Sequence, residues 1–244
     1  MKELDTFDNL IASFLNRLDN RIKYNKTFAD KYYKEDNQKD TNANFKYFKE
    51  KLLLVKNIIK KSGKESKILD IGCGTGRFLS LFKDEKIFGI DINQNMLNKA
   101  ELLKKDNKSL ILFKTDIINF NRFYKTQNFD FIYSIGVFGE HALIDKKTLN
   151  IIFLNLKAGG YLFFTMYDNG LRRKGISKLI IRLLEKFFQI IKLRNSAIYI
   201  SRRNNLEEII RNMENIEIIY KIRKSTSSTS WNGNHIIVLL KKKF

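Results

Sequence analysis

The spacing of apolar residues along the chain changes from a helical period to a strand period. Between residues 45 and 60, apolar positions recur at intervals of three and four, which predicts a helix that ends before Gly63. Short apolar runs follow at 67–71 and 86–91, and the residues around 78–82 are predicted to form a helical stretch between them. This order of elements predicts a βαβ unit with two parallel strands.

The same alternation continues through the middle of the chain. A helix is predicted at 146–156, and further strands are predicted at 110–114, 129–134 and 161–166. Alternating strands and helices are typical of a wound, largely parallel sheet. The last two predicted strands, 216–222 and 235–240, differ because only a polar Ser/Thr connector separates them. Such a connector is too short for a helical crossover, so these two strands are expected to pair antiparallel.

The composition indicates a folded chain in a reducing compartment. Its 244 residues are 43% hydrophobic and 30% charged, which is too apolar for disorder and too charged for a membrane protein with several spans. A single cysteine, Cys73, excludes an intrachain disulfide, and with only two histidines no zinc-finger cluster can form. Glu3 and Asp5 interrupt any secretory signal, and no apolar run reaches the length of about 18 residues that spans a membrane. We therefore expect a cytoplasmic protein without a bound metal.

Positive charge is concentrated in the last third of the chain. The net charge is +20, and residues 171–244 contribute most of it, with 17 basic and 5 acidic residues. Within this part, the apolar residues of 171–195 follow a helical spacing while basic residues occupy the other side. This pattern predicts a basic amphipathic helix with a net charge of +7. Such a helix can pack on the core, cover a substrate pocket or make peripheral contact with an anionic membrane.

A glycine cluster follows the first predicted strand. Residues 70–77 read Asp-Ile-Gly-Cys-Gly-Thr-Gly-Arg. Glycines at a strand-to-helix turn let the backbone approach a ligand, and the amino terminus of the helix presents unpaired N–H groups to it. A dinucleotide fingerprint requires glycine at the position of Arg77, and the Lys-Ser/Thr pair of a phosphate loop is also missing. The cluster therefore indicates a cofactor site but disfavours nicotinamide dinucleotides and ATP.

With this loop at its centre, the segment 67–100 and its continuation to residue 166 resemble the class I S-adenosylmethionine-dependent methyltransferases. The resemblance implies an α/β fold: a Rossmann-like three-layer sandwich around a seven-stranded, mostly parallel sheet with an antiparallel C-terminal strand. It also implies an enzyme with S-adenosyl-L-methionine as its cofactor. The regions that we expect are an N-terminal helical cap and first helix at 1–62, a cofactor-binding core at 63–170, the basic amphipathic insertion at 171–203, and the last helix with the terminal antiparallel strands at 204–244.

The resemblance assigns roles to three acidic residues near the ends of predicted strands. Asp91 lies about twenty residues after the loop and matches the acid that binds both ribose hydroxyls, a task that suits a carboxylate because it accepts two hydrogen bonds at once. Asp116 matches the acid that accepts from the adenine amino group, with Ile117 flanking the ring. Asp70 would order the loop and approach the ammonium end of the cofactor.

Each of these features also has a plainer interpretation. The glycines can form only a tight turn, Asp91 can be a helix cap, and Asp116 can be solvated. Their combination at the spacing of the family favours a cofactor site. The cofactor-binding residues that we expect are Asp70, Gly72, Cys73, Gly74, Thr75, Gly76, Asp91, Ile92, Asp116, Ile117 and Ser134, with Cys73 as a small filler rather than a nucleophile.

One histidine is a candidate catalytic residue. Residues 136–141 read Gly-Val-Phe-Gly-Glu-His and resemble the Glu-His that often follows the fourth strand in small-molecule methyltransferases, although the spacing from Asp130 is about one residue longer. Imidazole titrates near neutrality, so His141 suits the removal of a proton from the methyl acceptor. The alternatives are that His141 bonds only the backbone or contacts the cofactor. His235, at the start of the last predicted strand, is interpreted as structural.

The absence of proline and the position of the single cysteine disfavour two classes of methyl acceptor. The chain has no proline and therefore cannot hold the Pro-Pro motif of DNA amino-methyltransferases, and its cysteine is not placed as in RNA cytosine-C5 enzymes. We therefore expect methyl transfer to oxygen or nitrogen of a small molecule or glycoconjugate. Two alternatives stay open. Charge in the last third motivates an RNA methyltransferase, although nucleic acid is not the favoured partner. The basic helix at 171–195 motivates a non-catalytic cofactor-binding module at a membrane surface.

Overall fold

The structure is a computed structural model that describes residues 24–37, 43–60, 65–124, 128–168, 203–228 and 231–244. Its strands are β1 (Lys67–Ile71), β2 (Lys86–Asp91), β3 (Ile111–Lys114), β4 (Phe129–Phe138), β5 (Leu156–Tyr167), β6 (Ile216–Ser228) and β7 (Trp231–Lys242). Its helices are α2 (Lys26–Asn37), α3 (Ala43–Lys60), α4 (Gln94–Ala100), α5 (Ile117–Phe123), α6 (Lys146–Asn155) and α8 (Arg203–Arg211), with two 3-10 turns, η2 (Leu79–Phe82) and η3 (Glu101–Lys105).

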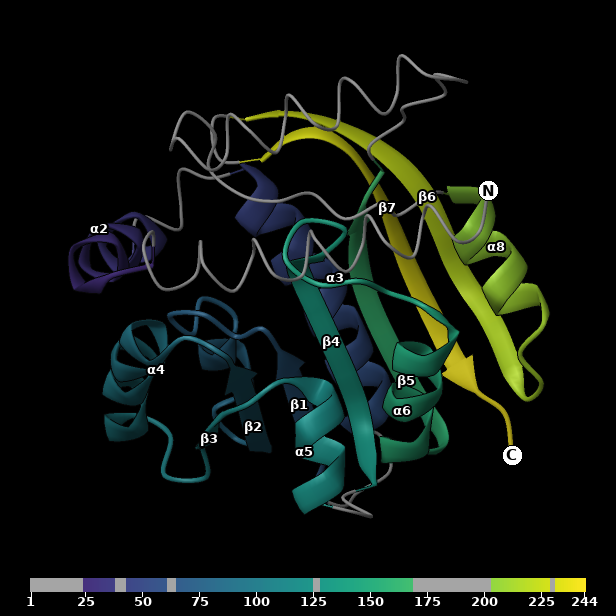
Figure 1. Ribbon diagram of the computed structural model, residues 1–244. Helices are drawn as coiled ribbons and strands as arrows, with labels where there is room; N and C mark the ends of the chain where they lie inside the picture. Colours follow the sequence, from purple (N-terminus) through teal and green to yellow (C-terminus); the bar gives the residue numbers. More distant parts are fainter. Residues whose placement is uncertain (1–23, 38–42, 61–64, 125–127, 169–202, 229–230) are drawn as a thin grey trace.

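One seven-stranded sheet in the order β3-β2-β1-β4-β5-β7-β6 forms the centre of the described structure (Figure 1). β1 pairs in parallel with both β2 and β4, and β3 and β5 extend the parallel part on either side. β7 runs antiparallel between β5 and β6. The expected Rossmann-like fold, with parallel strands at its start and an antiparallel final pair, is therefore confirmed.

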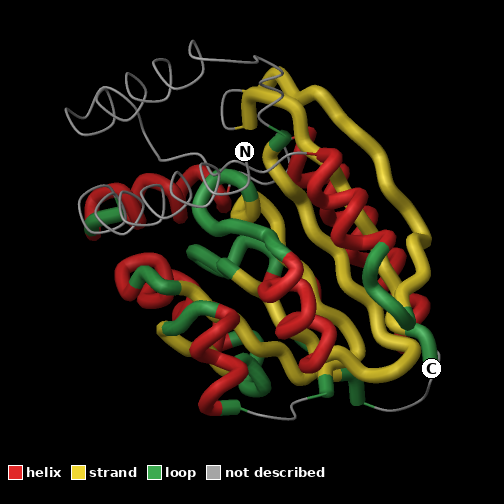
Figure 2. Tube along the Cα trace, turned by 45° about the vertical axis from the view of Figure 1, so that its right-hand side comes forward, coloured by secondary structure: helices red, strands yellow, loops and turns green. Residues whose placement is uncertain are grey.

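Helices cover both faces of the sheet, as the red segments on either side of the yellow strands show in Figure 2. On one face, α5, α6 and α8 bury Phe120, Leu149 and Leu206 in an apolar cluster with the strands. On the other face, α3 and η2 bury Leu52 and Phe82 in a second cluster. Full burial of each such side chain stabilises the fold by about 1.5–3 kcal/mol. These two layers hold rigid the strand ends that carry the candidate site.

The winding of the sheet reverses between β1 and β4. These strands are neighbours, although β2 and β3 lie between them in the sequence. In open α/β sheets, ligands bind at such a reversal, at the carboxyl ends of the strands. The carboxyl end of β1 leads directly into the glycine cluster, so the fold places the expected cofactor loop at the reversal point.

The helical stretch expected at 78–82 is only a short 3-10 turn, η2. Consecutive turns occupy the chain between β1 and η2, which leaves room for no longer helix before β2 begins at Lys86. Within the described residues 65–124, the glycine cluster therefore does not open an α-helix. The expectation of a helix amino terminus beside the cofactor is therefore wrong.

The polar segment expected as a connector is instead the end of a strand. β6 continues to Ser228, and residues 225–228 pair with 231–234 of β7. Threonine favours strands, so a polar composition alone does not predict a loop. A related difference occurs in β5, which was expected at 161–166 but begins at Leu156 and includes Gly159 at a break in the pairing with β4.

The basic amphipathic helix expected at 171–195 lies outside the described residues. Its packing, its contact with an anionic membrane and the four regional boundaries expected from the sequence stay predictions. None of the helices in the described ranges combines the length and hydropathy needed to cross a lipid bilayer.

His235 makes folding stability depend on pH. It lies in β7, 1% exposed, with its ring edge-on to Tyr167 at a centroid distance of 5.3 Å. Burial lowers the pKa of His235 from 6.5 to about 4. The unfolded chain therefore binds a proton at a higher pH than the folded chain. Stability from this residue is fully present above pH 6.5 and is lost as the pH falls toward 4.

We predict that this loss reaches about 2 kcal/mol between pH 7 and pH 4.5. Denaturant unfolding of wild type and His235→Gln at both pH values measures it, and the difference between the two proteins isolates the histidine. That subtraction matters because burial also raises the pKa values of Asp70 and Asp91. These two carboxyl groups therefore add stability as the pH falls, which opposes the effect of His235. Identical pH dependence of the two proteins would contradict the prediction.

Candidate functional site

The glycine cluster forms a tight loop that is pinned to the end of β2. The main-chain N–H groups of Gly72 and Cys73 both donate to the carbonyl oxygen of Ile90, at 2.8 and 3.0 Å. Gly72, Gly74 and Gly76 have φ angles of +74°, +56° and +87°. Residues with a Cβ atom rarely adopt these angles. The backbone path of the loop therefore requires glycine at all three positions.

Gly72 has a second constraint, which gives a matched pair of substitutions. A Cβ atom at Gly72 would lie 2.3 Å from Val137 Cγ2, whereas a Cβ atom at Gly74 would meet only Met96 Cε at 3.6 Å. We predict that Gly72→Ala lowers the free energy of unfolding by about 2–4 kcal/mol through both overlap and backbone strain. Gly74→Ala should cost about 1–2 kcal/mol, through strain alone.

Denaturant unfolding measures both values. Val137→Ala in the Gly72→Ala background should restore part of the lost stability, because it removes the overlapping atom. An equal cost at Gly72 and Gly74, or no recovery in the double variant, would show that the contact with Val137 is unimportant.

Asp91 lies against the glycine loop. Its Oδ2 accepts from the N–H of Gly74 at 2.9 Å, and its Oδ1 accepts from the N–H of Asn93 at 2.8 Å. Burial raises the pKa of Asp91, and these N–H groups partly oppose the rise. The N-cap of α4 is Asn93, whose side chain accepts from Met96, so Asp91 is not the helix cap. Each carboxylate oxygen keeps a further lone pair, which two ribose hydroxyls can use.

Asp116 lies close to Asp91 at the end of β3. The N–H of Thr115 donates to the carbonyl oxygen of Asp91 at 2.9 Å, which holds the two strand ends together. Asp116 is also the N-cap of α5: its two carboxylate oxygens accept from the main-chain N–H and the side-chain amide of Asn119, each at 2.8 Å. The side chain is exposed. Its role toward adenine stays a prediction, and it would have to share a carboxylate that already caps a helix.

The other expected cofactor-binding residues divide by exposure. Ile92 is 45% exposed beside Asp91 and offers an apolar side chain at the end of β2. The buried members are Cys73, Thr75, Ile117 and Ser134. The hydroxyl of Ser134 donates to the carbonyl oxygen of Ile71 at 2.9 Å and so ties β4 to the end of β1. Cys73 and Ile117 lie in the apolar clusters, so any contact of theirs with a cofactor would come from the main chain.

Asp70 is a buried acid in acidic surroundings. It is 4% exposed and stands next to Tyr133 in the pairing of β1 with β4. Burial raises the pKa of Asp70 well above its usual range; Tyr133 partly opposes the rise and the carboxylate of Asp91 adds to it. Burial and the two carboxylates also raise the pKa of the Cys73 thiol. A cationic group bound at the loop would favour the charged form of Asp70.

His141 lies in a tight turn directly after β4. Its N–H and that of Ala142 both donate to the carbonyl oxygen of Val137, at 2.8 and 3.0 Å. The side chain is 24% exposed, and its Nε2 lies 3.8 Å from Glu140 Oε2 and 3.2 Å from the hydroxyl oxygen of Tyr24. β4 is the parallel neighbour of β1, and the glycine loop follows the carboxyl end of β1. The turn therefore places the imidazole of His141 beyond the carboxyl end of β4, at the same edge of the sheet as the glycine loop.

Sequence reasoning missed three residues around this site. The side-chain amides of Asn93 and Asn95 both donate to the carbonyl oxygen of Tyr24, at 3.0 and 2.9 Å. The two asparagines lie two and four residues after Asp91, which is a signal that could have been used. For Tyr24 there was no such signal, because nothing in the local pattern indicates its approach to residues about 70 and 117 positions away.

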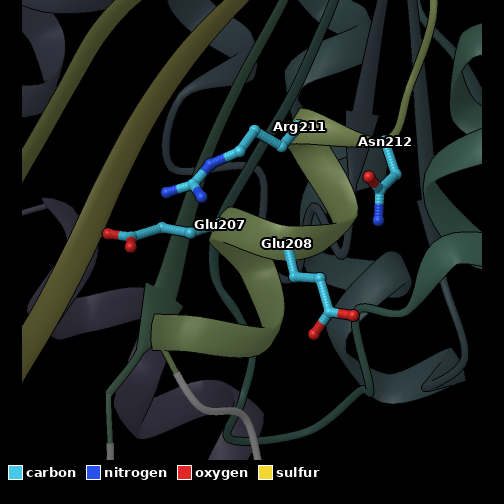
Figure 3. Close-up of a pocket in the computed structure, with 4 residues that line it drawn as sticks. All are labelled: Glu207, Glu208, Arg211 and Asn212. Carbon is cyan, nitrogen blue, oxygen red and sulfur yellow. The ribbon is translucent and has the colours of Figure 1, made fainter.

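A surface hollow of about 310 Å³ lies over α8 (Figure 3). It is not near the glycine loop, because α8 contacts the edge strand β6 and the loop follows β1 in the middle of the sheet. Glu207, Glu208, Arg211 and Asn212 line the hollow. Glu207 also pairs with Lys221 of β6 at 3.1 Å. The walls of the hollow are side chains of α8 and of the residue that follows it, so the hollow lacks the convergent polar groups from several elements that mark a cofactor site.

The residues at the loop fit an adenosyl cofactor. Asp91 can accept from two sugar hydroxyls, and Ile92 presents an apolar surface beside it for a base. Gly74 faces nearly open space, because a Cβ atom there would meet a single neighbouring atom. Asp70 is a buried acid beside the carboxylate of Asp91, which suits a positively charged ligand. These residues come from β1, β2 and the loop between them.

Comparison with known proteins gives a family match over most of the chain. Residues 62–225 match the family model described as a methyltransferase domain. A malonyl-[acyl-carrier protein] O-methyltransferase from Ilyobacter polytropus is 31% identical over 113 residues. That alignment covers 44% of this chain and 40% of the relative, so the chain matches well under half of the relative's length.

Solved methyltransferases share the fold. The N-methyltransferase NodS from Bradyrhizobium japonicum, solved with S-adenosyl-L-homocysteine, aligns with a TM-score of 0.57 over 86% of this chain and 97% of its own, at 16% identity. A SAM-dependent methyltransferase from Methanosarcina mazei aligns with a TM-score of 0.55 over 74% of this chain and 93% of its own, at 19% identity. At these identities the comparison concerns the fold alone.

Proposed function

Because the chain belongs to the family of S-adenosylmethionine-dependent methyltransferases, we propose that it transfers a methyl group to an oxygen or nitrogen atom of a small molecule or glycoconjugate. The family confirms the methyl donor that was expected from the sequence. The observation that carries the proposal is the position of Asp91, whose carboxylate lies against the glycine loop where the winding of the sheet reverses. Acceptor class and site residues are the part that we propose.

In this proposal, the glycine loop and the carboxyl ends of β1 and β2 bind the methyl donor. We assign the ribose to Asp91, the base to the side of Ile92 and the positively charged end to the neighbourhood of Asp70. A charge-assisted hydrogen bond to a carboxylate is roughly twice as strong as a neutral one, so Asp91 should dominate donor affinity.

Once bound, S-adenosylmethionine supplies a methyl group that is already activated by its positive sulfur. The chain has two remaining tasks: to hold the acceptor in line with that methyl group and to accept a proton when the acceptor loses one. We assign the second task to His141, whose imidazole lies beyond the end of β4. The Glu140 carboxylate, 3.8 Å from Nε2, would stabilise the protonated ring.

A carrier-bound carboxylic acid is the first acceptor that we would test. The Ilyobacter relative is named as acting on a malonyl group of acyl-carrier protein and methylates oxygen. A carboxylate oxygen needs no base, so a reaction that survives loss of His141 would favour such an acceptor. An amine or hydroxyl acceptor requires proton removal and should depend on His141.

The experiment is incubation of the pure protein with a donor labelled in its methyl group. The acceptors are malonyl-acyl-carrier protein and a cell extract divided into small molecules, glycans, lipids and RNA, and Asp91→Ala serves as the matched control. Label in the carrier or the small-molecule or glycan fraction, lost in the variant, is the expected result. Label confined to RNA, with a steep salt dependence, would overturn the acceptor class in favour of the RNA alternative.

A further inference from the structure

Tyr24 contacts both sides of the candidate site. Its carbonyl oxygen accepts from the side-chain amides of Asn93 and Asn95, at 3.0 and 2.9 Å. Its hydroxyl oxygen lies 3.2 Å from His141 Nε2, and the two rings meet edge to face with centroids 5.8 Å apart. One residue therefore joins the segment after β2 to the turn after β4.

The carbonyl end of this bridge reaches the acid assigned to the ribose. Asn93 donates its main-chain N–H to Asp91 Oδ1 at 2.8 Å and its side-chain amide to Tyr24 at 3.0 Å. Asn93 is buried and also caps α4. Tyr24 is thus one hydrogen-bonded residue away from Asp91.

The position of Tyr24 is fixed by the packing of α2 on α4, which lie side by side in Figure 1. Phe28 meets the Tyr24 ring edge to face at 4.8 Å. Tyr32 stacks on Phe28 at 5.8 Å, and the guanidinium of Arg77, from the end of the glycine loop, lies 5.4 Å from the Tyr32 ring. A row of aromatic rings therefore runs from the loop to His141.

Two further contacts anchor α2. Lys99 of α4 forms an ion pair with Asp30, and its ammonium group lies 5.9 Å from the centre of the Tyr33 ring. The ion pair lowers the pKa of Asp30. These contacts hold the helix without involving Tyr24, so its hydroxyl can be removed while α2 stays in place.

We propose that Tyr24 is a positioning residue, whose hydroxyl orients the imidazole of His141 while its carbonyl fixes that hydroxyl relative to the donor-binding end of β2. The proposal rests on the proposed function, in which His141 serves methyl transfer. A hydroxyl that accepts from Nε2–H holds the neutral ring with its lone pair on Nδ1, where it can take up a proton, and favours the protonated form. The Glu140 carboxylate, 3.8 Å from Nε2, also favours a proton on that nitrogen. Removal of the hydroxyl should therefore lower the affinity of His141 for a proton and leave the ring less well oriented.

The test measures the imidazole directly by NMR titration, which does not depend on turnover. The chain has only two histidines, so His235 serves as an internal reference. Tyr24→Phe keeps the ring and the carbonyl and removes only the hydroxyl; Tyr33→Phe makes the same change on α2 away from His141. We expect the pKa of His141 to fall by about 0.5–1 in Tyr24→Phe and to stay constant in Tyr33→Phe. The same value in wild type and both variants would overturn the proposal.

A kinetic cycle tests the same role during turnover. On an amine or hydroxyl acceptor, Tyr24→Phe should lower kcat about tenfold and leave the Kd of the donor within a factor of two. Tyr24→Phe in the His141→Ala background should cause no further loss. If the kcat losses of the two single variants multiply in the double variant, Tyr24 does not act through His141 and the proposal is overturned. If no acceptor is turned over while the pKa of His141 still falls in Tyr24→Phe, the proposed function fails and the contact between Tyr24 and His141 stands.

Discussion

Asp91→Ala is expected to weaken binding of S-adenosylmethionine by about 1–3 kcal/mol, a factor of roughly 5 to 150 in Kd. The reason is the loss of two charge-assisted hydrogen bonds to the ribose, made by the lone pairs that the bonds to Gly74 and Asn93 leave over. Isothermal calorimetry with the donor and with S-adenosyl-L-homocysteine measures the change. Both ligands carry the same ribose and should lose similar affinity.

Two variants make this result interpretable. Asp91→Asn keeps an acceptor for the N–H of Gly74 and should separate loop distortion from loss of the ribose contact. Asp106→Ala removes the same charge from an exposed site after η3 and should leave Kd unchanged. Unaltered donor affinity in Asp91→Ala would mean that another residue holds the ribose.

The second large effect is expected at the imidazole. His141→Ala should lower kcat by about 10²–10⁴-fold on an amine or hydroxyl acceptor, because no other group in the turn titrates near neutrality. Its donor Kd should stay near that of wild type, since the bonds at Asp91 do not involve this turn. Initial rates at saturating donor measure the loss, and added imidazole should restore part of the activity.

The control for His141→Ala is His141→Gln, which keeps a side chain that can bond Tyr24 but cannot take up a proton near neutrality. Both variants should be similarly slow if proton removal is the task. A fully active glutamine variant would reduce His141 to a structural partner of Tyr24, and a fully active alanine variant would remove it from the mechanism.

The central part of the fold could be predicted from the sequence because its elements are local and periodic. The runs at 67–71 and 86–91 became β1 and β2 within the expected bounds, since buried parallel strands are short apolar runs between glycines or charges. The antiparallel order of β6 and β7 followed from the length of chain between them. Asp91 could be placed beside the glycine loop for the same reason, because parallel strands end at a common edge.

Features that depend on contacts between distant parts of the chain could not be predicted from the sequence. The polar end of β6 is a strand because β7 pairs with it, and η2 stays a short 3-10 turn because the preceding turns use up the chain. The bond of the Ser134 hydroxyl to Ile71 also joins distant parts of the sequence, and the expected contact of Ser134 with the cofactor stays a prediction. The contact of Tyr24 with His141 spans 117 residues, and no local pattern encodes it.

A crystal structure of the protein with S-adenosyl-L-homocysteine tests the assignment of the donor site most directly. We expect both ribose hydroxyls within hydrogen-bonding distance of the Asp91 carboxylate and the amino-acid end of the ligand along the backbone of the glycine loop. A ligand bound elsewhere, with Asp91 still bonded only to Gly74 and Asn93, would contradict the account.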